Sequence, residues 1–180
     1  MAEHADGSRS GWEGFLKFEK LERNVAFSGE AFARVGGSQF FTEFSREDID
    51  TFAGYMEVYR AQTGDIVIRE DDPGDFMLLI VEGAMDILKK GAHGEPQHVT
   101  SVGPGMTLGE MSMIDGEPRF ATCVATTTTV FAAVTRDAMA RIMLDHPALG
   151  TKILVKLVAM LSLRLRQTSM RLLHFLDGGR

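Results

Sequence analysis

The stretch Gly109–Thr122 reads GEMSMIDGEPRFAT and combines acidic, basic, apolar and turn-forming residues within a short span. It is too apolar for a plain surface loop, and its proline argues against a central strand. Met111–Asp115 fits one helical turn, whose N-terminus would offer free N–H groups to an anion. Arg119 adds a forked cation suited to a phosphate. Glu110, when ionised, accepts a hydrogen bond from a hydroxyl such as that of a ribose. The stretch therefore predicts a site for a ligand that carries a phosphate close to a sugar hydroxyl.

The same two charges allow a plainer interpretation, in which Glu110 and Arg119 pair with each other and staple the loop. A buried ion pair is costly unless further partners satisfy its remaining donors and acceptors. That cost favours the ligand site over the staple.

Short apolar runs lie on both sides of this stretch, separated by turns rich in glycine and proline. Their length and spacing are typical of a small antiparallel β-barrel or sandwich. We expect a β-barrel of the jelly-roll type. The runs are Ile66–Ile68, Phe76–Val81, Met85–Leu88, His98–Val102, Thr122–Ala125 and Val130–Thr135.

Helices are expected at both ends of the chain. Trp12 to Leu21 has roughly helical spacing, and Ser45 followed by acidic residues resembles an N-cap of a helix that ends near Glu57. Thr135 caps a helix from Arg136 to Leu144, and Pro147 opens another that reaches about Leu176. The expected class is α+β. Its parts are a disordered tail (1–10), an N-terminal helical segment (11–60), the β-barrel (61–135) with the candidate site at 108–122, and C-terminal helices (136–180).

Composition narrows the function. The chain has 180 residues, 44% of them hydrophobic, so it should fold; its net charge of -6 argues against broad attraction to nucleic acid. The single cysteine, Cys123, permits no intrachain disulfide, and the N-terminus lacks the apolar core of a secretory signal, so we expect a cytoplasmic location. Charges interrupt the apolar stretch from Ala148 to Leu165 too often for a bilayer span. His93 and His98 form no paired ligand motif, so neither a metal nor a catalytic residue is expected.

From Leu108 the segment reads L-G-E-M-S-M-I-D-G-E-P-R-F-A-T. It resembles the phosphate-binding cassette of cyclic nucleotide-binding domains, roughly F-G-E-x-A-L-x-x-x-x-P-R-x-A-T. The segment Gly64–Gly83 is similar to the family's preceding G-x-x-I-x-x-x-G-D-x-G-D pattern, and the resemblance covers about residues 38–145. It implies that Glu110 accepts the ribose 2′-hydroxyl and that Arg119 pairs with the cyclic phosphate. The ligand-binding positions implied in the cassette are Gly109, Glu110, Met111, Ser112, Arg119 and Phe120, with backbone N–H groups near Ser112 and Phe120 meeting the phosphate.

Two positions depart from the family pattern. Phe120 stands where the family usually has alanine, threonine or serine, and Leu108 replaces the usual aromatic residue. In this family, a threonine at the position of Phe120 can favour guanine through a hydrogen bond from its hydroxyl, which phenylalanine cannot make. Phe120 either stacks on the base or narrows the pocket.

The C-terminal helix carries an apolar stripe and a second resemblance. "RLRQTSMRLLHFLD" (Arg164–Asp177) is similar to the dimer helix of the catabolite activator protein group, which implies that Thr168 and Ser169 meet an adenine across a homodimer. The alternative is a hydroxyl bonded back to its own helix. Five cations and no acid lie between Pro147 and Leu176; they form either a solvated face or a docking face for an acidic partner or anionic lipids. The stripe is Leu154, Leu157, Leu161, Leu165, Thr168, Leu172 and Phe175.

These features together favour a stand-alone cyclic nucleotide sensor that is not an enzyme and needs no cofactor. Its expected ligand is cAMP, and its C-terminal helix would pass ligand binding to a protein effector of unknown identity. The chain stops at Arg180, so no helix-turn-helix domain and no direct DNA binding are expected. Two alternatives stay open: a scaffold module that binds no nucleotide, with Phe120 filling the pocket, and a sensor of cGMP or a cyclic dinucleotide.

Overall fold

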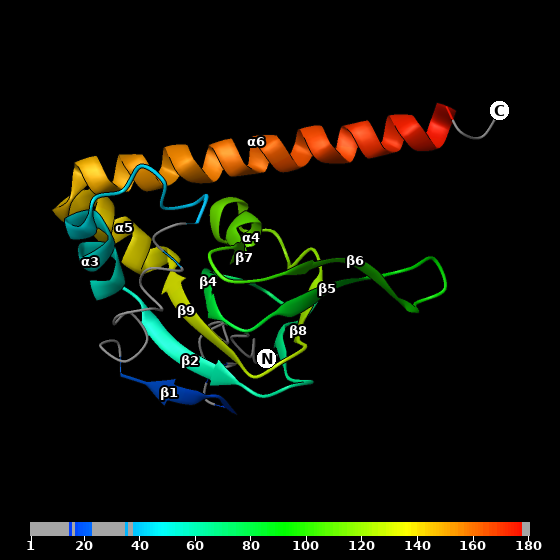
Figure 1. Ribbon diagram of the computed structural model, residues 1–180, viewed down its shortest axis with the longest axis horizontal. Coiled ribbons are helices and arrows are strands. Elements are labelled where there is room, and N and C mark those ends of the chain that lie inside the picture. Colours follow the sequence, from blue (N-terminus) through cyan, green and yellow to red (C-terminus); the bar gives the residue numbers. More distant parts are fainter. Residues whose placement is uncertain (1–14, 16, 23–34, 36–37, 178–180) are drawn as a thin grey trace, which may run out of the picture.

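The computed structural model describes residues 15, 17–22, 35 and 38–177, and its strands form two antiparallel sheets (Figure 1). The strands are β1 (Glu19–Leu21), β2 (Glu57–Ala61), β3 (Ile66–Ile68), β4 (Phe76–Glu82), β5 (Met85–Lys90), β6 (Pro96–Val102), β7 (Thr107–Leu108), β8 (Thr122–Ala125) and β9 (Thr129–Thr135). One sheet has the order β1-β2-β9-β4-β7, and the other has the order β3-β8-β5-β6.

The expected barrel is not closed. Among the described residues, β1 and β7 are the edges of the first sheet and β3 and β6 the edges of the second, and the two sheets stay separate. One physical reason is that β7 is only two residues long before the chain turns into a helix, so the ladder cannot continue around the structure. The mixed α+β class with antiparallel sheets and a long C-terminal helix is confirmed.

Strand β4 shows how the core is built. Successive side chains of a strand point to opposite faces, and β4 is buried on both. Phe76, Leu78 and Ile80 join the core between the two sheets. Met77, Leu79 and Val81 join a second core, against the helices. This double burial explains why β4 reads as a continuous apolar run.

Two short helices begin at the residues that the sequence predicts. Helix α3 (Arg46–Gly54) starts at Ser45, which shares a capping box with Asp48. Helix α5 (Arg136–Asp145) starts at Thr135, whose hydroxyl accepts a hydrogen bond from the backbone N–H of Ala138 at 3.1 Å. Both caps satisfy N–H groups that the first helical turn leaves free.

The N-terminal expectation is partly wrong. Glu19–Leu21 is a strand and not part of a helix, because it pairs antiparallel with Val58–Arg60 of β2. The sheet therefore begins before the expected boundary at residue 61. The expected tail at 1–10 and Trp12 lie outside the described residues.

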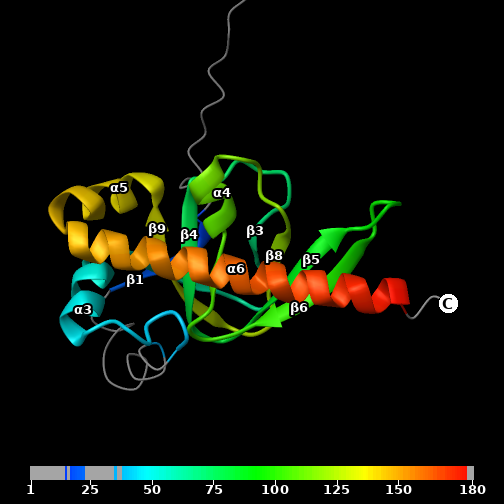
Figure 2. The ribbon, with the colours of Figure 1, turned by 90° about the horizontal axis from the view of Figure 1, so that it is seen from above.

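Helix α6 (Pro147–Asp177) covers the helical side of the core and then extends beyond it (Figures 1 and 2). Its first half buries Leu149, Ile153 and Leu157. Its far half is exposed, with Leu165 67% and Leu172 61% accessible. No helix in the described part of the chain combines the length and apolar character needed to cross a bilayer.

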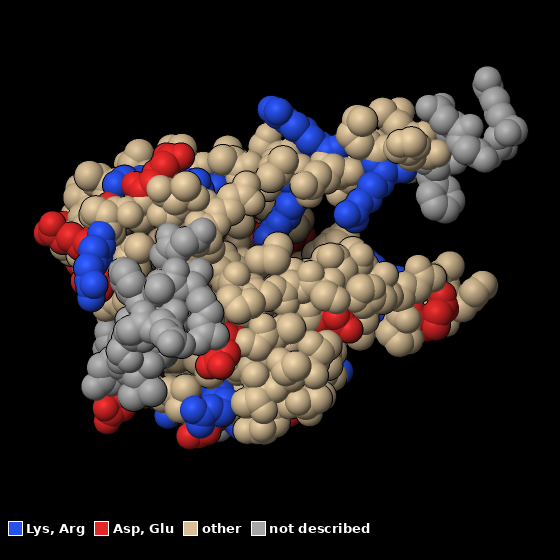
Figure 3. All heavy atoms as spheres, in the orientation of Figure 1, with Lys and Arg blue, Asp and Glu red and all other residues tan. Residues whose placement is uncertain are grey.

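Most of the positive charge on α6 is paired with acidic groups of the rest of the molecule. Lys152 lies 2.6 Å from Asp48 and Lys156 lies 3.7 Å from Glu43. Arg164 pairs with Glu110. Lys and Arg side chains are visible along the helix in Figure 3, where its far half stands apart from the β5–β6 hairpin. The basic residues Lys152, Lys156 and Arg164 of α6 therefore form ion pairs within the molecule.

Candidate ligand-binding site

The candidate site is built where β7 turns into helix α4 (Glu110–Asp115). Gly109 forms this turn with a φ of 77°, a conformation that L-residues with a side chain rarely adopt. A Cβ at Gly109 would also lie 2.6 Å from Nη1 of Arg119. The glycine is thus required both by the turn and by the close approach of the arginine.

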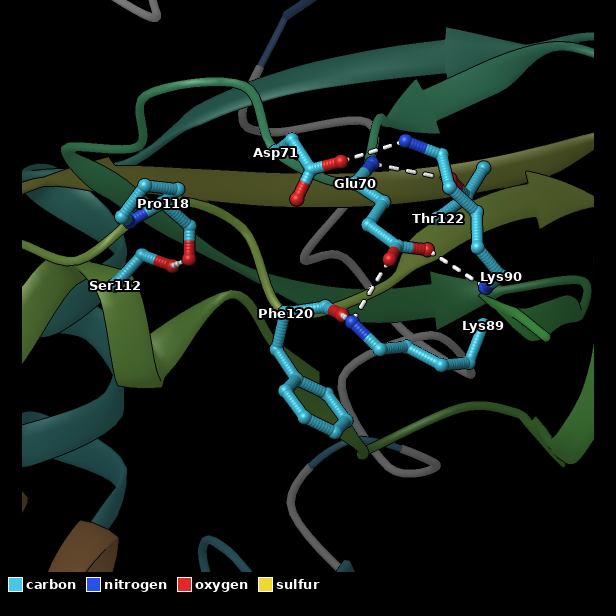
Figure 4. Close-up of polar contacts among 8 residues, drawn as sticks. All are labelled: Glu70, Asp71, Lys89, Lys90, Ser112, Pro118, Phe120 and Thr122. Carbon is cyan, nitrogen blue, oxygen red and sulfur yellow. Dashed lines mark hydrogen bonds and ion pairs between the residues drawn. The ribbon is translucent and has the colours of Figure 1, made fainter. Parts of the chain in front are cut away.

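The other end of α4 is fixed by Arg136, a residue that was not predicted to belong to the site. Its Nε donates to the carbonyl oxygen of Met113 at 2.7 Å, and its Nη2 donates to that of Ser112 at 2.8 Å. A cation at a helix C-terminus satisfies carbonyl groups that lack helical partners. The Ser112 hydroxyl donates to the carbonyl oxygen of Pro118 at 3.3 Å, so α4 is also tied to the chain just before Arg119 (Figure 4).

Arg119 is the buried cation of the site, with 3% of its surface exposed. Its Nη1 donates to the carbonyl oxygens of Phe76, at 2.9 Å, and Gly109, at 2.8 Å. Its Nη2 has no hydrogen-bond partner among the described residues. Burial lowers the pKa of Arg119 to about 10, so the side chain still carries its charge at neutral pH. A buried charged donor without a partner is costly, and an anion at Nη2 would relieve that cost.

Gly74 makes room for this arginine. A Cβ at position 74 would lie 2.1 Å from Nε of Arg119, closer than real Cβ atoms approach other atoms. The guanidinium also lies over the ring of Phe76, at 4.0 Å from the centroid. Gly74, Phe76 and Gly109 together fix the position of Arg119.

Glu110 is the buried acid of the site and is 3% exposed. Its Oε1 accepts a hydrogen bond from Nη1 of Arg164, and its Oε2 has no partner among the described residues. Burial raises the pKa of Glu110, while the charges of Arg164 and Arg119 lower it. No Glu110–Arg119 ion pair occurs among the described residues, so the plain staple interpretation is wrong as stated. Oε2 of Glu110 can therefore accept a hydrogen bond from a ligand hydroxyl.

Arg164 was missed by the sequence analysis. It comes from α6 and also donates from Nη2 to the carbonyl oxygen of Thr107 at 2.9 Å. The available signal was its position on the inward face of the helix, seven residues after Leu157 and four after Met160. A basic residue at the end of a buried stripe needs an acidic or carbonyl partner.

The remaining predicted residues are more exposed. Met111 lies on the outer side of α4, and Phe120 is 58% exposed. Thr168 and Ser169 lie on the exposed far half of α6, beyond Arg164. The Ser169 hydroxyl donates back to the carbonyl oxygen of Leu165 at 2.9 Å, as the alternative interpretation of this pair expects. The structure therefore brings Gly109, Glu110, Ser112 and Arg119 together within the chain, and leaves Thr168 and Ser169 outside that group.

Comparison with known proteins identifies the class. Residues 59–146 match the family described as the cyclic nucleotide-binding domain. The crystal structure of a cyclic nucleotide-binding domain from Methylobacillus flagellatus is similar, with a TM-score of 0.77 and 35% identity, over 88% of this chain and 89% of that one. The chain belongs to the cyclic nucleotide-binding domain family, which is typically regulatory and not catalytic.

Two curated relatives show the range of proteins that carry such a domain. The CRP-like cAMP-activated global transcriptional regulator of Mycobacterium tuberculosis is 34% identical over 59% of this chain and 46% of its own length. The cAMP-dependent protein kinase regulatory subunit of Blastocladiella emersonii is 29% identical over 63% of this chain and 28% of its own length. The chain thus spans less than half the length of these curated relatives.

Proposed function

We propose that this protein is a stand-alone cytoplasmic sensor of a cyclic nucleotide, with cAMP as its ligand. The observation that carries the proposal is a pair of buried, unpartnered atoms, Nη2 of Arg119 and Oε2 of Glu110. A cyclic phosphate complements the first and a ribose 2′-hydroxyl complements the second. The curated relatives described above are named for cAMP, which supports this nucleotide over others.

Arg164 would couple ligand binding at the site to a change in the position of α6. One end of this residue belongs to α6, and its guanidinium holds both Glu110 and the carbonyl oxygen of Thr107. A ligand hydroxyl on Glu110 would share that carboxylate with Arg164 and so change the contact between α6 and the site. A ligand shifts a conformational equilibrium only through different affinities for its states, and this shared carboxylate supplies such a difference.

The far half of α6 would carry the output as a homodimer. Leu157 is buried in the core, so the apolar seam passes instead through its exposed neighbour Val158. With that change the spacing alternates strictly between four and three residues, which is the pattern of a coiled-coil seam. A second copy of α6 would cover this seam and place Thr168 and Ser169 near the partner's site. The seam is Leu154, Val158, Leu161, Leu165, Thr168 and Leu172.

Calorimetric titration of the full chain with cAMP, cGMP and cyclic di-GMP tests the ligand assignment. We expect heat with cAMP, and a loss of affinity of roughly 10- to 100-fold in Arg119→Gln, because a charge-assisted hydrogen bond is lost. The matched control is Arg166→Gln on the exposed part of α6. No heat with any of the three would favour the scaffold function, and tighter binding of cGMP or the dinucleotide would reassign the ligand. Unchanged cAMP affinity in Arg119→Gln would remove the role given to that residue.

A further inference from the structure

A cluster of charged residues lies beside the cassette and is not used by the site described above. Lys89, near the end of β5, donates from Nζ to Oε1 of Glu70 at 2.8 Å and to the carbonyl oxygen of Phe120 at 2.7 Å. The same Nζ lies 4.5 Å from the centroid of the Phe120 ring. Figure 4 shows the Lys89 side chain running from β5 to these two groups. An ammonium has three N–H donors, so two hydrogen bonds and one ring contact use its full capacity.

Glu70 is itself firmly held, which makes it a fixed anchor for Lys89. Only 6% of its surface is exposed. Its Oε2 accepts a hydrogen bond from the backbone N–H of Lys90 at 2.9 Å, and its own N–H donates to Oγ1 of Thr122 at 3.0 Å. The carboxylate is thus fixed from β5 and the backbone from β8, so Lys89 cannot move far from the cassette without losing a buried partner.

The backbone around Phe120 is equally fixed. The N–H of Arg119 donates to the carbonyl oxygen of Asp72 at 2.8 Å, and the N–H of Asp71 donates to the carbonyl oxygen of Arg119 at 3.0 Å. With its carbonyl oxygen held by Lys89, Phe120 has one ring face beside an ammonium, yet its side chain stays 58% exposed. The ring is therefore oriented by the protein while much of its surface stays open.

We propose that Lys89 is a positioning residue that, anchored by Glu70, holds the Phe120 ring as a stacking platform for the base of the ligand. The inference rests on the proposed function, in which Arg119 binds the cyclic phosphate and Phe120 is the next residue of the same segment. Every base has a π-face, so stacking tolerates different bases, whereas hydrogen bonds to base edges do not. The platform therefore predicts similar affinities for cAMP and cGMP.

The test is calorimetric titration of the full chain with cAMP, cGMP and the 3′,5′-cyclic phosphate of ribose, which lacks a base. Three variants are compared with wild type: Phe120→Ala, the double variant Glu70→Gln/Lys89→Met, and Lys90→Met. The double variant avoids leaving the Glu70 carboxylate buried without its ammonium. Lys90 is the matched control, since its Nζ pairs with Asp71 at 2.5 Å on the same turn. Thermal unfolding of each variant establishes that it folds.

Phe120→Ala should weaken cAMP and cGMP binding by roughly 5- to 100-fold, the range of a lost base–aromatic stack. The double variant should weaken both by roughly 2- to 5-fold, the range of a lost cation–π contact. Neither change should alter binding of the base-free probe, and Lys90→Met should change none of the affinities. This split separates positioning of the ring from a general structural effect.

Several results would overturn the inference. They are an equal loss for the base-free probe, an equal effect of Lys90→Met, or a preference of more than about 100-fold between cAMP and cGMP in the wild type. In each of these cases nucleotide binding, and so the proposed function, would stand. Absence of binding by all three probes to the folded wild-type chain would instead overturn the proposed function and the platform together.

Discussion

Arg164 of helix α6 and Glu110 of helix α4 are 54 residues apart in the chain and form an ion pair in the wall of the candidate site. The acid is buried, whereas the side chain of the arginine is 36% exposed. The pair therefore joins the interior of the site to a helix that extends away from it.

Arg164→Gln should lower both stability and ligand affinity. The substitution leaves the Glu110 carboxylate without its cationic partner, and a buried polar group that loses its partner costs about 1–3 kcal/mol. Arg166→Gln removes the same charge from the exposed face of the same helix and should change stability by less than about 0.5 kcal/mol. Thermal unfolding and cAMP titration measure both effects. Equal behaviour of the two variants would contradict the role of the ion pair.

Glu110→Gln should have opposite effects on stability and on binding. Burial raises the pKa of this carboxyl, so the folded chain binds its proton more tightly than the unfolded chain does. The wild type therefore loses stability as pH rises through the folded-state pKa, and the glutamine variant does not. We expect the variant to be the more stable of the two at pH 7, with the difference vanishing well below the ordinary carboxyl pKa of 4.5, where the wild type is protonated in both its folded and its unfolded state.

Melting temperatures recorded from pH 4 to pH 8 check this expectation. Glu117→Gln, an exposed acid in the same segment, is the control for the change in net charge. Affinity for cAMP should fall only in the Glu110 variant. A stability difference that grows toward acid pH would show the sign to be wrong.

Gly74→Ala should disturb Arg119 although it adds a single methyl group. Its Cβ would lie 2.1 Å from Nε of that buried side chain, and overpacking of this kind costs about 1–3 kcal/mol. Gly54→Ala is the matched control, because nothing lies within 4 Å of its added Cβ. We expect the control to be unchanged or stabilised by up to about 1 kcal/mol. Calorimetry on both variants decides the matter, and equal cAMP affinities would mean that Arg119 is not held by this contact.

Leu165→Glu should convert a dimer into monomers if the seam on α6 joins two copies. A charge at the centre of an apolar seam must be desolvated in the dimer. Leu173→Glu is the control, since Leu173 is also exposed but lies off the seam. Sedimentation equilibrium should give twice 19.8 kDa for wild type and control, and 19.8 kDa for Leu165→Glu. A wild-type mass of one chain would exclude this dimer.

The local parts of the fold were predictable from the sequence. Ser45, Thr135 and Pro147 mark helix starts through chemistry that acts within one turn, and apolar runs mark most of the strands. Strand β1 was not predictable in this way, because its three residues become a strand only through pairing with β2. The open ends of the two sheets likewise depend on tertiary pairing and not on any local pattern.

The same distinction applies to the site. Gly109, Glu110 and Arg119 lie within one short segment, so their spacing alone indicated a shared role. Arg164 reaches the site only because α6 packs across the core. Its helical spacing after Leu157 and Met160 places it on the inward face, but this local pattern does not identify Glu110 as its partner. Asp71 also depends on a contact from another part of the chain. It has a φ of 69° at the position where the family pattern has glycine, and its side chain accepts a hydrogen bond from Nζ of Lys90.

The length of α6 has a mechanical consequence. At 1.5 Å per residue, the helix extends about 20 Å from Arg164 to its last residue. As a rigid lever pivoting at the ion pair, it would turn a tilt of about 10° into a displacement of about 3 Å at its tip, more than half of one helical turn. A rearrangement at the Glu110–Arg164 pair that tilts the helix would thus produce its largest displacement at the far end, where a partner would contact it.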